Sequence, residues 1–199
     1  MSNQIQTIIQ VELEDRNRVT AFFRLILVMP VAIYASAYAL NSYSNEDWLL
    51  GLSALVVVPT MLALVIRGIY PSYALSFNHA LLSLETRINA YALLLTDDYP
   101  SIEENEIVTV TFPEVGNGSN LSRGLPLIKW FLAIPHYVMA IIYAIFGLLL
   151  TVFAWFSILF SGKYPVFCAD AIVGILAYFN RVAGYAFILV TDEYPSFSL

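Results

Sequence analysis

Cysteine and charged residues are both scarce in this sequence. The single cysteine, Cys168, excludes an internal disulfide. Only 12% of the 199 residues are charged and 59% are hydrophobic, with a mean hydropathy of +0.73. Ordinary globular chains carry roughly a quarter charged residues. This composition therefore favours an integral membrane protein over a soluble one.

Basic residues are missing from the stretch that holds many of the acids. Between Leu95 and Val115 the sequence has Asp and Glu at several positions but no Lys or Arg. We therefore expect no nucleic-acid partner, since binding phosphates requires a basic face. The polar N-terminus lacks a positively charged segment followed by an apolar one, so we expect no cleavable signal peptide.

Motifs for catalysis, metals and cofactors are also missing. His79 and His136 have no second metal ligand at helical spacing, and there is no glycine-rich phosphate loop or nucleophile elbow. The paired acids of residues 96–100 and 191–195 fit a turn better than acid–base chemistry or a cation site, because adjacent side chains point apart. The sequence thus predicts no catalytic residue, no metal and no cofactor.

The same series of motifs occurs twice in the sequence, in the same order. TDDYPS at residues 96–101 recurs as TDEYPS at 191–196. Arg18, Arg24 and Pro30 match Arg123, Lys129 and Pro135, each 105 residues later. These matches predict two tandem copies, residues 1–104 and 105–199, with an extra loop at residues 41–47 in the first copy.

Each copy predicts a short strand, two transmembrane spans and an amphipathic helix. Alternating residues at 8–13 and 107–112 favour strands, which we expect to pair in the cytoplasm. Apolar runs of about 20 residues cross the hydrocarbon core. They predict spans at about 20–40 and 48–66, and at about 125–144 and 147–161 with a tight turn near Gly147. A tilted or re-entrant arrangement is the alternative for the second pair.

The last segment of each copy predicts a helix lying along the membrane surface. In residues 72–95 and 166–189, polar positions that include Arg87 and Arg181 share one helical face and apolar residues fill the other. A membrane-crossing helix is the alternative. The predicted fold is an all-α integral membrane protein with four spans, two interfacial helices and short cytoplasmic strands.

All nine basic residues fit on one side of this topology, which predicts a multi-pass membrane protein with both termini cytoplasmic. Arg24, Lys129, Arg87 and Arg181 are the candidates for functional or lipid-headgroup contacts. Arg24 and Lys129 lie at equivalent positions just inside their spans. We expect them to snorkel to the headgroups; the alternative is a ligand or counter-ion site inside the helix bundle.

Several strings in the second copy are distinctive: LPLIKWFLAIPHY at 125–137, FSGKYP at 160–165, RVAGYAFIL at 181–189 and TDEYPSF at 191–197. They resemble the bacterial membrane family known as domain of unknown function 4389, most closely over residues 121–199. Val190 departs from the pattern as an extra residue before Thr191. The resemblance implies an uncharacterised integral membrane protein and supplies no activity and no catalytic residues.

The sequence favours a non-enzymatic structural or accessory subunit, with the lipid bilayer and other membrane subunits or a second copy as partners. Small residues such as Ala35, Gly147 and Ala154 motivate this, because they let helices approach closely in lipid. The alternative is an oligomeric transporter or channel for a small solute or ion. A lipid-modifying enzyme is a third and weaker reading.

Overall fold

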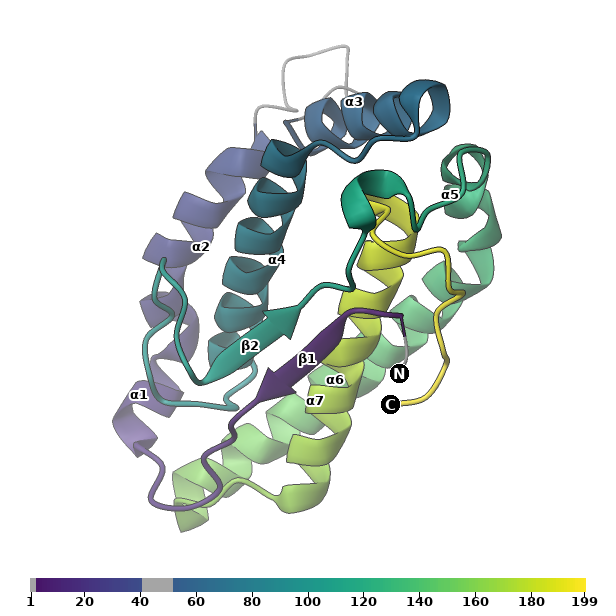
Figure 1. The fold of residues 1–199 in the computed structure, drawn as a ribbon. Helices are drawn as coiled ribbons and strands as arrows, with labels where there is room; N and C mark the ends of the chain where they lie inside the picture. Colours follow the sequence, from purple (N-terminus) through teal and green to yellow (C-terminus); the bar gives the residue numbers. More distant parts are fainter. Residues whose placement is uncertain (1–2, 41–51) are drawn as a thin grey trace.

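The computed structural model describes residues 3–40 and 52–199 of a mostly helical chain with one small sheet (Figure 1). The elements are β1 (Gln6–Ile9), α1 (Arg18–Phe22), α2 (Arg24–Leu40), α3 (Leu52–Arg67), α4 (Ser72–Ala92), β2 (Val108–Thr111), the 3-10 turns η1 (Gly116–Gly118) and η2 (Leu125–Leu127), α5 (Lys129–Leu132), α6 (Ile134–Ser161), α7 (Val166–Ala183) and the π-helical η3 (Gly184–Ile188). The extra loop predicted at residues 41–47 lies outside the described residues.

Two helical segments are long and apolar enough to cross a membrane: Ile134–Ser161 and Val166–Ile188. The helices α2 and α3 lie within the spans predicted at 20–40 and 48–66 and are shorter, with 17 and 16 residues. The segment Val166–Ile188 coincides with the predicted interfacial helix at 166–189. Its length and composition suit a crossing as well, so the interfacial placement stays a prediction.

The two spans predicted at 125–144 and 147–161 are wrong, because α6 is one continuous helix of 28 residues. No turn forms near Gly147. This glycine is buried against α7 instead, where an added Cβ would lie 3.3 Å from the side chain of Ile175. At 1.5 Å per residue the helix is about 42 Å long. Lys129 and Lys163 therefore lie near its opposite ends, whereas the predicted topology needed a turn between them.

The two predicted strands pair, as expected. β1 and β2 run antiparallel, with Thr7 opposite Val110 and Ile8 opposite Thr109. β2 lies inside the predicted 107–112, whereas β1 begins two residues before the predicted 8–13 and shares only Ile8 and Ile9 with it. The ribbon lies across α4 and α7 (Figure 1), with Val108 and Val110 buried and Ile8 61% exposed. Alternation along the strands thus places one face on the helices and leaves the other open.

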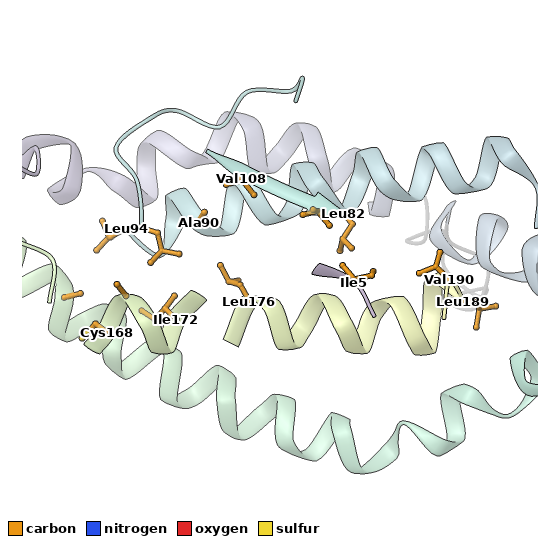
Figure 2. Packing of buried hydrophobic residues seen from close by; sticks show 14 of the residues in the cluster. Ile5, Leu82, Ala90, Leu94, Val108, Cys168, Ile172, Leu176, Leu189 and Val190 are labelled. Carbon is orange, nitrogen blue, oxygen red and sulfur yellow. The ribbon is translucent and has the colours of Figure 1, made fainter. Parts of the chain in front are cut away.

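The core lies between α4 and α7 (Figure 2). Leu82, Ala90 and Leu94 meet Cys168, Ile172 and Leu176 there. The two helices are joined at their crossing by hydrogen bonds between Thr86 and Asn180, whose amide also donates to the Thr7 hydroxyl of the ribbon. α2 packs beside α4 and α6 packs beside α7. The order α2, α4, α7, α6 therefore forms a layer beneath the ribbon.

Two tyrosines hold the two halves of the chain together by reciprocal hydrogen bonds. The Tyr70 hydroxyl donates to the Ile188 carbonyl at 2.6 Å, and the Tyr164 hydroxyl donates to the Leu93 carbonyl at 3.1 Å. Each tyrosine precedes a proline that begins a helix, and each partner carbonyl lies at the C-terminal end of the other half's helix. Carbonyls at helix ends lack helical partners, so each half caps the other.

Candidate functional site

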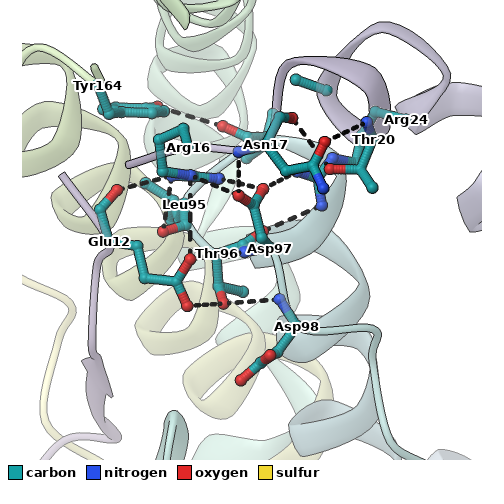
Figure 3. A network of polar contacts seen from close by, with 12 residues as sticks. Glu12, Arg16, Asn17, Thr20, Arg24, Leu95, Thr96, Asp97, Asp98 and Tyr164 are labelled. Carbon is teal, nitrogen blue, oxygen red and sulfur yellow. Dashed lines mark hydrogen bonds and ion pairs between the residues drawn. The ribbon is translucent and has the colours of Figure 1, made fainter. Parts of the chain in front are cut away.

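A network of polar contacts surrounds Asp97, in the turn that follows α4 (Figure 3). The Arg16 guanidinium donates to both carboxylate oxygens, at 2.9 and 3.1 Å, and the backbone N–H of Asn17 donates at 2.8 Å. Arg24 forms an ion pair with the same carboxylate and donates to the Thr96 carbonyl at 3.1 Å. Asp97 therefore ties the start of the chain to the end of α4, about 80 residues later.

An equivalent network lies at the other end of the layer. The Lys129 ammonium is fully buried, 2.6 Å from an Asp192 carboxylate oxygen and 2.6 Å from the Thr191 carbonyl. The backbone N–H of Ser122 donates to Asp192 at 2.5 Å. Ser122 and Lys129 follow Asn17 and Arg24 by 105 residues, and Asp192 follows Asp97 by 95. The matched positions thus make matched contacts.

The electrostatics of both aspartates favour the ionised form. Burial by itself raises the pKa of Asp97, but hydrogen bonds from Arg16 and Asn17, with the charge of Arg16 and a hydrogen bond from Arg24, hold that pKa below its usual value. Burial also opposes ionisation of Asp192, and the bonds from Lys129 and Ser122 outweigh it and lower the pKa. Both acids act as structural counter-ions.

These contacts correct the expectation that Arg24 and Lys129 snorkel to lipid headgroups. Their side chains are 2% and 0% exposed, and both point to aspartates of the chain itself. The sequence indicated a turn at the paired acids and missed this role. The signal available was that each Asp recurs with a basic residue at an equivalent position in its own copy.

Arg87 and Arg181 bind backbone carbonyls of the segments that follow their helices. Arg87 is buried and donates to the Ser101 and Ile102 carbonyls at 2.9 and 3.0 Å. Arg181 donates to the Ser198 carbonyl. All four basic candidates are therefore engaged within the protein, and the structure does not gather them into one site.

The groove with the chemistry of a binding site lies elsewhere, between α4, α6 and α7. Its volume is about 680 Å³, and its lining is mainly apolar. Ligand sites have volumes of about 300–1,000 Å³ and a few placed polar groups on apolar walls. Here the polar groups are the side chains of Glu85 and Asn89 on α4, Tyr137 and Tyr143 on α6, and Asn180 on α7.

Glu85 was not among the site residues predicted from the sequence, because the prediction for this helix considered only its polar face, where Arg87 lies. Residues two apart on a helix do not face each other. Glu85 therefore lies on the apolar face, where it is the one acid in the helix Ser72–Ala92. Burial in the groove raises the pKa of its carboxyl. An acid on the apolar side of an amphipathic helix was the available signal.

A second, polar hollow lies over the ribbon and is lined by His79, Glu104 and Phe112 among others. The His79 ring meets the Val110 carbonyl at 2.8 Å and the exposed Glu104 carboxylate at 3.6 Å. Within residues 3–40 and 52–199 no three potential metal-ligating side chains come together.

Comparison with known proteins identifies the second half of the chain. Residues 126–198 match the family described as Domain of unknown function (DUF4389). No curated protein and no solved structure matches the chain. The matched segment contains Lys129, Asp192 and two of the three helices that form the groove. Residues 126–198 therefore match the family that the motifs of this segment indicated, DUF4389.

Proposed function

We propose that this protein is a non-enzymatic accessory subunit embedded in the bacterial cytoplasmic membrane, with lipid and other membrane subunits or a second copy as partners. The observation that carries the proposal is the surface of α6. This helix has no Asp, Glu, Lys or Arg, and only four of its 28 residues are buried. Large apolar side chains remain exposed along it: Ile141, Ile145, Leu149, Phe153 and Phe160. A soluble monomer rarely exposes so long an apolar surface.

The basic candidates support a structural role. Arg24 and Lys129 are buried and form ion pairs with Asp97 and Asp192, and Arg87 and Arg181 bind backbone carbonyls. Catalysis needs ionisable groups free to touch a substrate. These four side chains instead join segments that are distant in the sequence.

We also propose that the chain arose by tandem duplication and that its halves are related by a two-fold axis through the ribbon. The equivalent ion pairs at Asp97 and Asp192 support this, as do the reciprocal bonds of Tyr70 and Tyr164. Thr86 and Asn180, which are 94 residues apart, meet at the crossing of α4 and α7. An axis through that point relates one half to the other.

The ribbon supports a one-sided arrangement in the membrane. A two-stranded ribbon has unpaired backbone groups on both edges, which hydrocarbon does not accommodate. Since the ribbon lies across α4 and α7, those helices run along the membrane surface beneath it. α6 packs along α7, with Phe153 near Phe167 and Ala133 near Tyr185. It then lies in the lipid with both ends at one surface, and every basic residue stays on that side.

Cysteine labelling tests this arrangement. In a Cys168→Ala background, single cysteines replace Arg123 and Lys163, which are exposed residues on either side of α6. A membrane-impermeant maleimide is applied to vesicles of each orientation. We expect both cysteines to react from the same side. Reaction from opposite sides would show that α6 crosses the bilayer and would refute the one-sided arrangement.

Purification tests the subunit role. The full chain is extracted from native membranes in mild detergent, and its mass is measured by sedimentation with and without cross-linking before extraction. We expect it to sediment as a self-assembly or with a stoichiometric partner. A lone monomer in every mild detergent, with no cross-linked species, would contradict the proposal.

Transport of a small solute is the second candidate, and the groove between α4, α6 and α7 favours it. Flux into liposomes containing the purified protein would support this role. Substituting Arg24 or Lys129 does not test it, because both residues are buried ion-pair partners whose loss damages the fold. Glu85→Gln is the better variant, since that side chain lines the groove.

A further inference from the structure

Glu85 and Asn89 lie one helical turn apart on α4 and both line the groove. Residues four apart are neighbours on a helix surface. Neither side chain has a hydrogen-bond or ion-pair partner within the part of the chain that the structure describes. Both residues are exposed at the groove, so their side chains are open to a group that comes from outside these residues.

The groove is negative and unbalanced. Its lining includes Glu85 and no Lys, Arg or His. Aromatic rings of Tyr137, Tyr143, Phe179 and Phe187 form part of its walls. Such rings present their negative faces to cations. The negative charge of the groove thus favours a cationic group, and its apolar walls favour a ligand whose remaining part is apolar.

The groove also connects to the apolar outside of α6. Leu148 lines the groove and is itself 61% exposed, and Ile141 and Ile145 continue the exposed face. An aliphatic chain from the bilayer reaches the groove sideways, without passing through water. This favours a membrane lipid over a soluble amine.

We propose that the groove binds a phospholipid whose headgroup carries a primary amine, with one aliphatic chain against α6 and α7. The ammonium donates a hydrogen bond to the Glu85 carboxylate and a second to the Asn89 side-chain oxygen. A quaternary ammonium has no N–H and leaves both acceptors unmet. The inference rests on the proposed membrane location and adds the class of lipid.

Native mass spectrometry of the full chain tests the site. The protein is released from micelles that contain phosphatidylethanolamine, phosphatidylcholine and phosphatidylglycerol at equal mole fractions, with the same acyl chains. We expect phosphatidylethanolamine to be retained about tenfold over each of the others, on the scale of one charge-assisted hydrogen bond. Glu85→Gln keeps the shape, removes the charge and brings the ratio near one.

Two further variants make the test specific. Glu106→Gln removes an exposed acid far from the groove, and it leaves the ratio unchanged. Ala144→Phe narrows the groove and lowers retention of all three lipids without changing their ranking. Thermal unfolding of each variant establishes that it is folded before its lipids are counted.

A preference that survives Glu85→Gln, or equal retention of the three lipids by the unmodified chain, overturns the proposal. Displacement of the lipid by millimolar ethanolamine also overturns it, because the site then belongs to a soluble amine. Carbonate extraction of membranes separates this failure from failure of the proposed function. A chain that stays in the membrane but shows no amine preference loses only the lipid site.

Discussion

The buried pair of Lys129 and Asp192 gives the sharpest test of the structure. Asp192→Asn leaves a fully buried ammonium without its counter-ion, which costs about 3–5 kcal/mol of unfolding free energy. Lys129→Met costs less, about 1–3 kcal/mol, because Asp192 keeps the bond from Ser122 and its side chain is 22% exposed. The double variant lies near Lys129→Met alone, so the coupling between the two sites is about 3–5 kcal/mol, the cost of Asp192→Asn.

Thermal unfolding in lipid-free micelles measures these differences. At about 2–4 °C per kcal/mol for a chain of this size, Asp192→Asn lowers Tm by about 6–20 °C. The matched control is Lys163→Met, which removes an exposed pair with Glu14 and leaves Tm nearly unchanged because solvent screens that pair. A snorkelling lysine gives small and additive effects. Equal, additive losses for the two single variants would therefore refute the buried pair.

Three more outcomes follow from the same contacts. The pKa values of Asp97 and Asp192 are lowered, so their ion pairs stabilise the fold above about pH 4, and this contribution is lost as pH falls through the lowered values. Asp97→Asn therefore flattens the low-pH part of a plot of Tm against pH. An unchanged slope contradicts this. Tyr164→Phe costs about 1 kcal/mol in denaturant unfolding, since it frees one helix-end carbonyl. Tyr70→Phe costs more, since it also removes the acceptor of the buried Asn78 amide, and a smaller loss than that of Tyr164→Phe contradicts this. Desolvation raises the pKa of Glu85, so Glu85→Gln raises Tm at neutral pH in lipid-free micelles. The gain disappears below about pH 4.3, where the carboxyl is protonated in both the folded and the unfolded protein. A lower Tm at pH 7 shows instead that the carboxylate stabilises the empty groove.

The sequence allowed β2, part of β1 and the family match to be predicted, because each depends on a local pattern or on distinctive strings. Alternation located β2 and the last two residues of β1, and the strings around Lys129 and Asp192 indicated DUF4389. The pairing of the strands was expected without a local signal for it. The turn near Gly147 was not predictable in the same way. Glycine there serves close packing against Ile175, and a contact with a residue 28 positions later leaves no local signature.

The polar networks escaped prediction for a related reason. Asp97 contacts Arg16 and Arg24 across more than 70 residues, and no spacing rule connects positions so distant. The prediction of a turn at residues 96–100 explained the backbone conformation at Asp97, but it named no partner for the Asp97 carboxylate. A buried basic residue needs an acid, and each of the repeated motifs at 96–101 and 191–196 offered two. Charge pairing between equivalent positions was the inference that the sequence permitted.

One residue shows how the two halves differ in detail. Arg87 and Arg181 are 94 residues apart, whereas Leu94 and Leu189, both with left-handed φ near +65°, are 95 apart. Under the proposed duplication, residues 105–199 therefore carry one residue more between these two positions than residues 1–104. The π-helical η3, Gly184–Ile188, lies within that interval. A π-turn takes up one residue more than an α-turn. The insertion is thus absorbed inside the helix, so that Thr191 and Asp192 still reach Lys129. The sequence offset that appeared at Val190 arises several residues earlier, because the helix widens to preserve a buried ion pair.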